Sequence, residues 1–189
     1  MTRKPFRLLV LAVTAATAAL VAPAPAHAAS PYCGITWGSL PKASNASDTE
    51  MVNGVRAGRH ACFDRLVVDL GGQDTMFGSY DVRYVAQVHA AGSGDAVPVR
   101  GAADLQIVLR APAYDQNGDV TFRPRDPREV VDVSGYPTFR QVAWAGSYEG
   151  STTMALGVRA RLPFRVFPLP GTPQSDDGPR LVIDVAHAW

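Results

Sequence analysis

Three arginines recur at even spacing near the end of the chain. Arg159, Arg161 and Arg165 alternate with small or apolar residues. In a continuous strand the three guanidinium groups would share one face, although Pro163 would bend it. Guanidinium groups bind carboxylates in a bidentate manner, so the spacing predicts an anion-binding surface. The alternative is a solvated outer face on which the arginines pair with acidic neighbours such as Asp69 and Asp184.

Aromatic side chains next to turns are a second candidate binding feature. Tyr114 and Tyr148 each lie beside a turn signal, and we expect them to be exposed and able to stack on a sugar ring. The alternative, which applies to most of the Trp and Tyr residues here, is core packing.

Acidic residues recur at a spacing that resembles a calcium loop. Asp115, Asn117 and Asp119 are two residues apart, and Asp126 follows. A calcium loop requires glycine where this chain has Val120, and it closes with Glu rather than Asp. The pattern therefore predicts a hairpin turn around Asn117-Gly118 and no metal.

The remaining residues form no catalytic pattern. His60, His89 and His187 lack the spacing of a zinc motif. The stretch 146–150 has glycine at both ends, but Tyr148 stands where a nucleophile elbow has serine. We predict no catalytic residues and no cofactor.

The N-terminus has the three parts of a secretory signal. It begins with basic residues, continues with an apolar run over 8–21, and reaches a small-x-small cleavage pattern at 26–28. We therefore expect a signal peptide at 1–28, a secreted mature domain at 29–189, and no membrane span after cleavage. Cleavage removes three basic residues and no acidic ones, which changes the net charge from +1 to −2. That balance argues against nucleic acid as a partner.

Two cysteines remain in the mature chain, Cys33 and Cys62. In an exported protein such a pair predicts a disulfide, which would tether an N-terminal segment (29–53) to a core domain (54–189). Because residues 38–54 are small and polar, we expect a surface loop there.

From residue 63 onward, short alternating runs separated by turn signals indicate an all-β fold. Turn signals include Asn117-Gly118 and Gly146-Ser147. So many short strands favour a β-sandwich or a flattened barrel. The expected strands are 64–70, 80–88, 97–100, 104–110, 119–122, 129–133, 138–144, 152–161, 163–167 and 180–187.

One six-residue phrase occurs twice. Residues 65–70 read RLVVDL and residues 180–185 read RLVIDV. Each predicts a strand with one fully apolar face and one face that carries Arg and Asp. Two strands of one design suggest internal two-fold symmetry.

Several phrases together resemble the actinobacterial secreted AMIN-like domain proteins, over nearly the whole mature chain. The phrases are 59–70, 80–85, 111–115, 138–147 and 180–189. That family is similar to the AMIN domain of N-acetylmuramoyl-alanine amidases, which targets peptidoglycan. The resemblance implies a β-sandwich of two symmetry-related antiparallel sheets without catalytic activity. It also implies a cell-wall-associated or extracellular protein that binds peptidoglycan or an envelope protein.

The residues leave other functions open. One alternative is a secreted interaction or inhibitor protein that binds another exported protein. A further one is a wall-active hydrolase with a dispersed site. Peptidoglycan stem peptides carry carboxylates, which makes Arg159, Arg161 and Arg165 the expected contact surface, with Tyr114 and Tyr148 as further candidates. The ligand, the binding face and the oligomeric state stay open.

Overall fold

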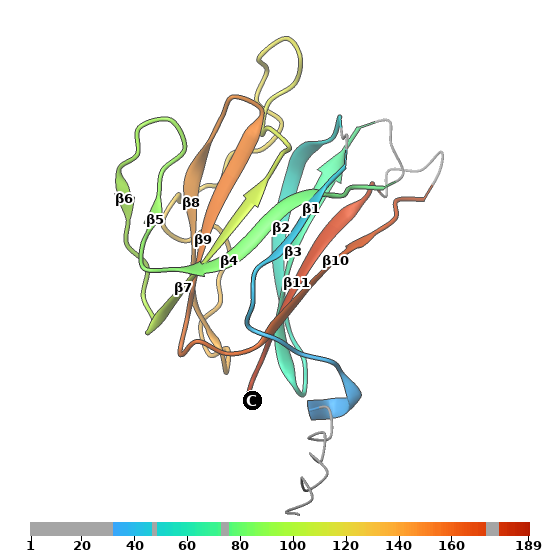
Figure 1. The fold of residues 1–189 in the computed structure, drawn as a ribbon. Coiled ribbons are helices and arrows are strands. Elements are labelled where there is room, and N and C mark those ends of the chain that lie inside the picture. Colours follow the sequence, from blue (N-terminus) through green and yellow to red (C-terminus); the bar gives the residue numbers. More distant parts are fainter. Residues whose placement is uncertain (1–31, 47–48, 73–75, 173–177) are drawn as a thin grey trace, which may run out of the picture.

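The computed structural model describes residues 32–46, 49–72, 76–172 and 178–189, and the expected signal peptide lies outside these ranges. The fold is all-β: two antiparallel sheets pack face to face as a sandwich (Figure 1). The described elements are η1 (Tyr32–Gly34), β1 (Lys42–Asn45), β2 (Met51–Arg59), β3 (Phe63–Gly71), β4 (Ser79–Val85), β5 (Val88–His89), β6 (Ala96–Val97), β7 (Ala103–Leu109), β8 (Phe139–Tyr148), β9 (Ser151–Val158), β10 (Phe164–Leu169) and β11 (Arg180–Ala186).

The two sheets differ in size. One has five strands in the order β1-β4-β7-β9-β8, and the other has four in the order β10-β11-β3-β2. Strands β5 and β6 form a small separate hairpin that projects beside the five-stranded sheet (Figure 1). The strands give the sandwich two ends. The upper end in Figure 1 carries the β8–β9 turn, and the lower end carries the β2–β3 turn and the C-terminus.

Alternating apolar side chains fill the space between the sheets. Leu66 and Val68 of β3 and Ile183 of β11 are fully buried, as are Leu105 and Ile107 of β7 in the facing sheet. Burial of one such side chain contributes roughly 1.5–3 kcal/mol. The apolar face that the repeated phrase predicts is therefore confirmed as the core face of the four-stranded sheet.

The two copies of the repeated phrase are neighbouring strands. β3 and β11 pair antiparallel, with Val67 opposite Val182 at the centre. Because the two copies run antiparallel, the Arg of each copy faces the Asp of the other: Arg65 lies opposite Asp184, and Asp69 lies opposite Arg180. The symmetry expected from the repeat is a local two-fold relation inside one sheet, whereas the two sheets have five and four strands.

Some expected elements were wrong. The supposed loop at 38–54 contains β1 and the start of β2. Residues 119–122 and 129–133 lie outside the strands, and Gly146-Ser147 lies inside β8 at a register shift. The turn at Asn117-Gly118 is confirmed: Gly118 has φ +85° and donates its N–H to the Asp115 carbonyl at 3.0 Å.

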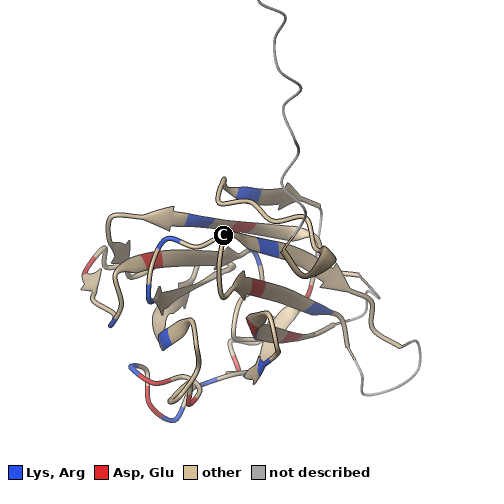
Figure 2. Ribbon diagram, turned by 90° about the horizontal axis from the view of Figure 1, so that it is seen from below, with Lys and Arg blue, Asp and Glu red and all other residues tan. Residues whose placement is uncertain are grey.

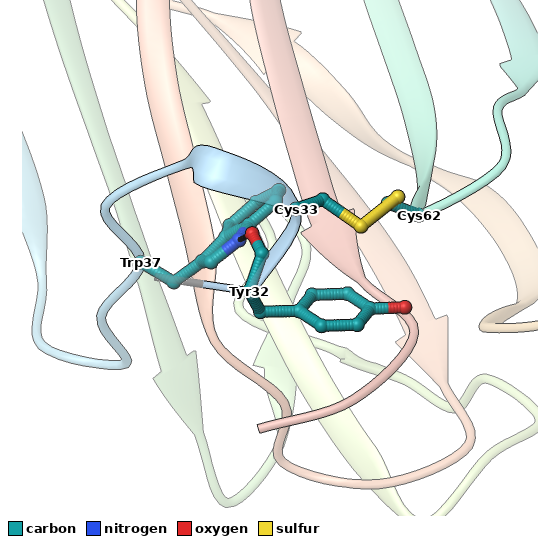
Figure 3. The surroundings of a disulfide bond; sticks show 4 residues. All are labelled: Tyr32, Cys33, Trp37 and Cys62. Carbon is teal, nitrogen blue, oxygen red and sulfur yellow. Dashed lines mark hydrogen bonds between the residues drawn. A yellow bond between two sulfur atoms is a disulfide. The ribbon is translucent and has the colours of Figure 1, made fainter. Parts of the chain in front are cut away.

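The N-terminal segment, residues 32–46, joins both sheets. The predicted disulfide is present between Cys33 and Cys62 in the β2–β3 turn (Figure 3). Trp37 lies beside it and donates from Nε1 to the carbonyl of Tyr32 at 2.9 Å. The segment then accepts a hydrogen bond at the Gly38 carbonyl from the Phe164 N–H in β10, and it continues as β1 on the edge of the five-stranded sheet. It therefore links the two sheets along one side.

Candidate functional site

Arginines from separate segments gather at the lower end of the sandwich. Arg59 ends β2, Arg140 lies at the start of β8, and Arg159 and Arg161 lie in the link between β9 and β10. Seen from below, basic ribbon segments lie on both sides of the C-terminus (Figure 2). The sandwich topology thus brings together cations that are far apart in the sequence.

The hydrogen-bond partners of these four guanidinium groups are backbone carbonyls. Arg59 donates to Gly135 at 3.3 Å, and Arg140 donates from Nη1 to the carbonyls of Tyr136 and Phe139 at 3.0 and 2.8 Å. A carbonyl orients a guanidinium group but does not cancel its charge.

The other two arginines follow the same pattern. Arg159 donates to the His187 carbonyl, and Arg161 donates to the Ser39 carbonyl at 3.5 Å. Arg161 also lies over the ring of Tyr84, 4.9 Å from its centroid. Within the described part of the chain, none of the four arginines of the lower end forms an ion pair with a carboxylate.

Two of the acidic groups nearby have hydrogen-bond partners of their own, and burial acts on a third. Glu129 pairs with Arg100. The backbone and side chain of Ser134 donate to Asp132 and lower its pKa. Burial raises the pKa of Asp104, which lines the same hollow as Arg161. None of these three carboxylates pairs with the four arginines of the lower end among the described residues.

A hollow of about 450 Å³ lies within this surface. Its walls include Arg100, Arg140 and the ring of Tyr136, together with the turn residues Ser134 and Gly135. Arg100 pairs with Glu129, so among the described residues of this wall Arg140 is the guanidinium group without a carboxylate partner, and such a group can hold a carboxylate or a phosphate.

Arg165 is separate from the other two predicted arginines. Strand β9 ends at Val158, and β10 begins in the other sheet at Phe164, so the expectation of one continuous strand was wrong. Arg165 donates from Nε to Asp184 Oδ2 at 2.8 Å. Its carboxylate partner has no exposed surface. The alternative of pairing with an acidic neighbour therefore holds for Arg165.

Arg165 belongs to a stack on the outer face of the four-stranded sheet. Its guanidinium carbon lies 5.4, 5.4 and 4.9 Å from the ring centroids of Trp37, Phe63 and Phe167. Arg65 shares Asp184 from the other side, and this hydrogen bond raises the pKa of Arg65. Contacts of this kind rigidify a surface and leave Arg165 little freedom to bind a ligand.

Tyr114 and Tyr148 lie together at the upper end. Tyr114 lines a cavity of about 510 Å³, and its hydroxyl accepts a hydrogen bond from the Gly150 N–H at 3.0 Å. Tyr148 ends β8, is half exposed, and packs against Gly92. The predicted residues thus divide between two ends: Arg159 and Arg161 at the lower end, and the two tyrosines at the upper end.

In the acidic segment that resembles a calcium loop, carboxylate oxygens accept hydrogen bonds from backbone N–H groups. Asp115 Oδ1 accepts from the N–H groups of Asn117 and Asp119 at 2.8 and 2.9 Å, and Asp126 Oδ1 accepts from the Arg128 N–H. The described residues contain no group of three or more His, Cys, Asp or Glu side chains placed to hold a metal ion.

The three histidines of the mature chain have separate structural contacts. His60 stacks on Phe63 at a centroid distance of 4.5 Å, and His89 contacts the Gly94 carbonyl. His187 Nε2 lies 3.1 Å from Asp64 Oδ1. Each histidine therefore has a structural contact of its own.

Asp64 is a buried residue whose role the sequence did not reveal. Its Oδ2 accepts from the N–H groups of Thr138 and Phe139 at 2.6 and 3.0 Å, while Oδ1 meets His187. The available signal was an acidic residue at the start of the strand, in phase with the inward-facing Leu66 and Val68. These contacts hold the start of β8 and the C-terminal segment in place beneath the arginines.

The chain matches a protein family. A family model described as the AMIN-like domain matches residues 50–187, which is most of the chain. No curated protein matches. Among the described residues, no helix has the length and apolar character needed to cross a membrane.

Proposed function

The chain belongs to the AMIN-like domain family, and from this premise we propose that it is an exported, non-catalytic module that binds peptidoglycan. Membership of this family supports a role related to the cell envelope. The lower end, centred on Arg159 and Arg161, is the proposed binding surface. The ligand groups are the carboxylates of the stem peptides.

The observation that carries this proposal is the set of four arginines whose hydrogen-bond partners, among the described residues, are backbone carbonyls. Each guanidinium has five donors, and the contacts described above use only some of them. The free donors of Arg59, Arg140, Arg159 and Arg161 can still bind a carboxylate. Charge-assisted hydrogen bonds of this type are roughly twice as strong as neutral ones.

The structure changes the role proposed for Arg165. Its charge is shared with Arg65 against one buried carboxylate, Asp184. We assign it to the stability of the sheet, and Arg59 and Arg140 take its place at the binding surface.

Co-sedimentation of the mature protein (29–189) with insoluble sacculi tests the proposal. We expect binding at low salt that falls as salt rises, because exposed charges are screened. An Arg159→Ala/Arg161→Ala variant should bind at least about tenfold more weakly, which corresponds to 1.4 kcal/mol.

The matched control removes the same charge elsewhere. Arg110 and Arg123 are exposed, and they lie in and next to the loop 110–122 at the upper end, away from the proposed surface. Arg110→Ala/Arg123→Ala should retain binding. Equal loss in both double variants, or no sedimentation of the native protein, would contradict binding at the lower end. Cross-linking in culture would then test an exported protein as the partner.

A further inference from the structure

A cavity at the upper end is distinct in chemistry from the arginine surface. It has a volume of about 510 Å³, within the range typical of small-molecule sites. It lies between the start of β2, the end of β3 and the loop 110–122. The lining residues are Thr49, Met51, Gly72, Pro112, Tyr114, Asp115, Gln116 and Asn117.

Hydrogen bonds hold the loop that forms one side of this cavity. The Val52 N–H donates to the Pro112 carbonyl at 2.8 Å, and Thr121 Oγ1 donates to the Val52 carbonyl at 2.9 Å. The Ala113 N–H donates to Ser147 Oγ at 2.9 Å. These bonds fix the loop to both sheets, so the side of the cavity that the loop forms is preformed.

The side chains at the rim are polar and preoriented. Asp115 is fixed by two backbone N–H groups, and the Tyr114 hydroxyl is fixed by Gly150. Gln116 and Asn117 add carboxamides, each of which can both donate and accept hydrogen bonds. Met51 and Pro112 provide apolar surface together with Tyr114.

This combination suits one class of ligand. The described residues that line the cavity include no Lys or Arg, and Asp115 would repel an anion. A neutral pyranose has an apolar ring face and a rim of hydroxyl groups that donate and accept. Carboxylate and carboxamide groups match the rim, and Tyr114 matches the ring.

We propose that this cavity is a second binding site, which takes an uncharged pyranose unit. The source of that sugar would be the wall glycan, so this part rests on the proposed function. The two sites would then bind different parts of the polymer: the upper end would bind a sugar unit, and the lower end would bind a stem-peptide carboxylate.

The test is an NMR titration of the mature protein (29–189) with N-acetylglucosamine trimer, an uncharged soluble probe. We expect shift changes at 49–51, 72 and 112–117, with a dissociation constant on the order of 1 mM. High salt should leave the affinity unchanged, because no charge pair is involved. A polyuronate probe, which carries carboxylates on the same ring, should not bind there.

Variants separate this site from the arginine surface. Gln116→Ala and Asn117→Ala change exposed side chains and should each weaken binding at least about fivefold, or roughly 1 kcal/mol. Tyr114→Ala should abolish it. Tyr148→Ala is the matched control, since it removes a half-exposed tyrosine at the same end that packs against Gly92. It should bind as the native protein does, and so should Arg159→Ala/Arg161→Ala.

Failure of this proposal is distinguishable from failure of wall binding. Sedimentation with sacculi but no shifts with the trimer would overturn the sugar site alone. Shifts with the trimer without sedimentation would support the sugar site and overturn wall binding. Shifts that spread over the lower end, or that survive in Tyr114→Ala, would also overturn the sugar site.

Discussion

Arg65 and Asp184 lie opposite one another on β3 and β11 and form a two-armed ion pair. Arg65 Nε is 2.6 Å from Oδ1, and Nη2 is 2.8 Å from Oδ2. Arg165 binds the same carboxylate from β10, so one buried anion links three adjacent strands.

Asp184→Asn should strongly destabilise the fold. The substitution leaves Arg65 and Arg165 without their counter-ion on a largely covered surface. Breaking a buried pair in this way costs about 3–5 kcal/mol. Urea unfolding measures the change. The control is Asp69→Asn, whose pair with Arg56 is more exposed and should contribute no more than about 1 kcal/mol. Similar losses in both variants would contradict the special role of Asp184.

Removal of the disulfide should destabilise the protein by about 3–4 kcal/mol, since the bond closes a loop with a sequence separation of 29. The variant is Cys33→Ser/Cys62→Ser, and thermal unfolding with and without reductant is the measurement. The native protein should lose stability in reductant and the variant should not. A variant as stable as the oxidised native protein would show that the N-terminal segment contributes little.

Gly157→Ala should destabilise β9. An added Cβ would lie 2.0 Å from the Arg100 carbonyl oxygen, which is backbone and cannot rotate away. Overpacking typically costs about 1–3 kcal/mol, and this contact lies at the severe end. Gly58→Ala is the control, because the nearest atom is a His60 side-chain nitrogen 3.8 Å away. Chemical unfolding compares the two, and equal stability would argue against this close approach of residues 100 and 157.

The Tyr84 hydroxyl should ionise at an unusually high pH in the folded protein. Burial raises its pKa to about 12, and its hydroxyl donates to the Leu162 carbonyl at 2.7 Å. Because the pKa is raised in the folded state, its stabilising effect is complete below about pH 10 and is lost as pH rises toward 12. Ultraviolet titration of phenolate should show a late phase that is missing in Tyr84→Phe. A titration without that phase in the native protein would contradict the burial.

Much of the fold was predictable because side-chain alternation reports burial. The core faces of β3 and β11 and the disulfide followed directly from the sequence. Strand β2 was missed because Asn53, Gly54 and Gly58 resemble loop residues. It forms nonetheless, since its partner β3 supplies the hydrogen bonds on one side.

The same alternation led to the wrong prediction of one continuous strand through the three arginines. Ala160, Leu162 and Phe164 do face inward as a strand would place them, and Leu162 and Phe164 are buried. Alternation of apolar and polar residues indicates which side chains are buried. It does not show whether the hydrogen bonds between neighbouring strands continue. Here the chain crosses between sheets, which separates Arg161 from Arg165. The upper cavity could not be predicted at all, because its walls come from segments distant in the sequence.

The antiparallel match of the repeated phrase has a consequence for assembly. The phrase is self-complementary: β3 could pair equally well with β3 of a second molecule, with Arg65 against the Asp69 of the other copy and Val67 against Val67. Within one chain, the strand that pairs with β3 is β11, which lies more than 100 residues further along the sequence. Refolding is therefore a competition between chain closure and strand exchange, and its yield should fall as protein concentration rises.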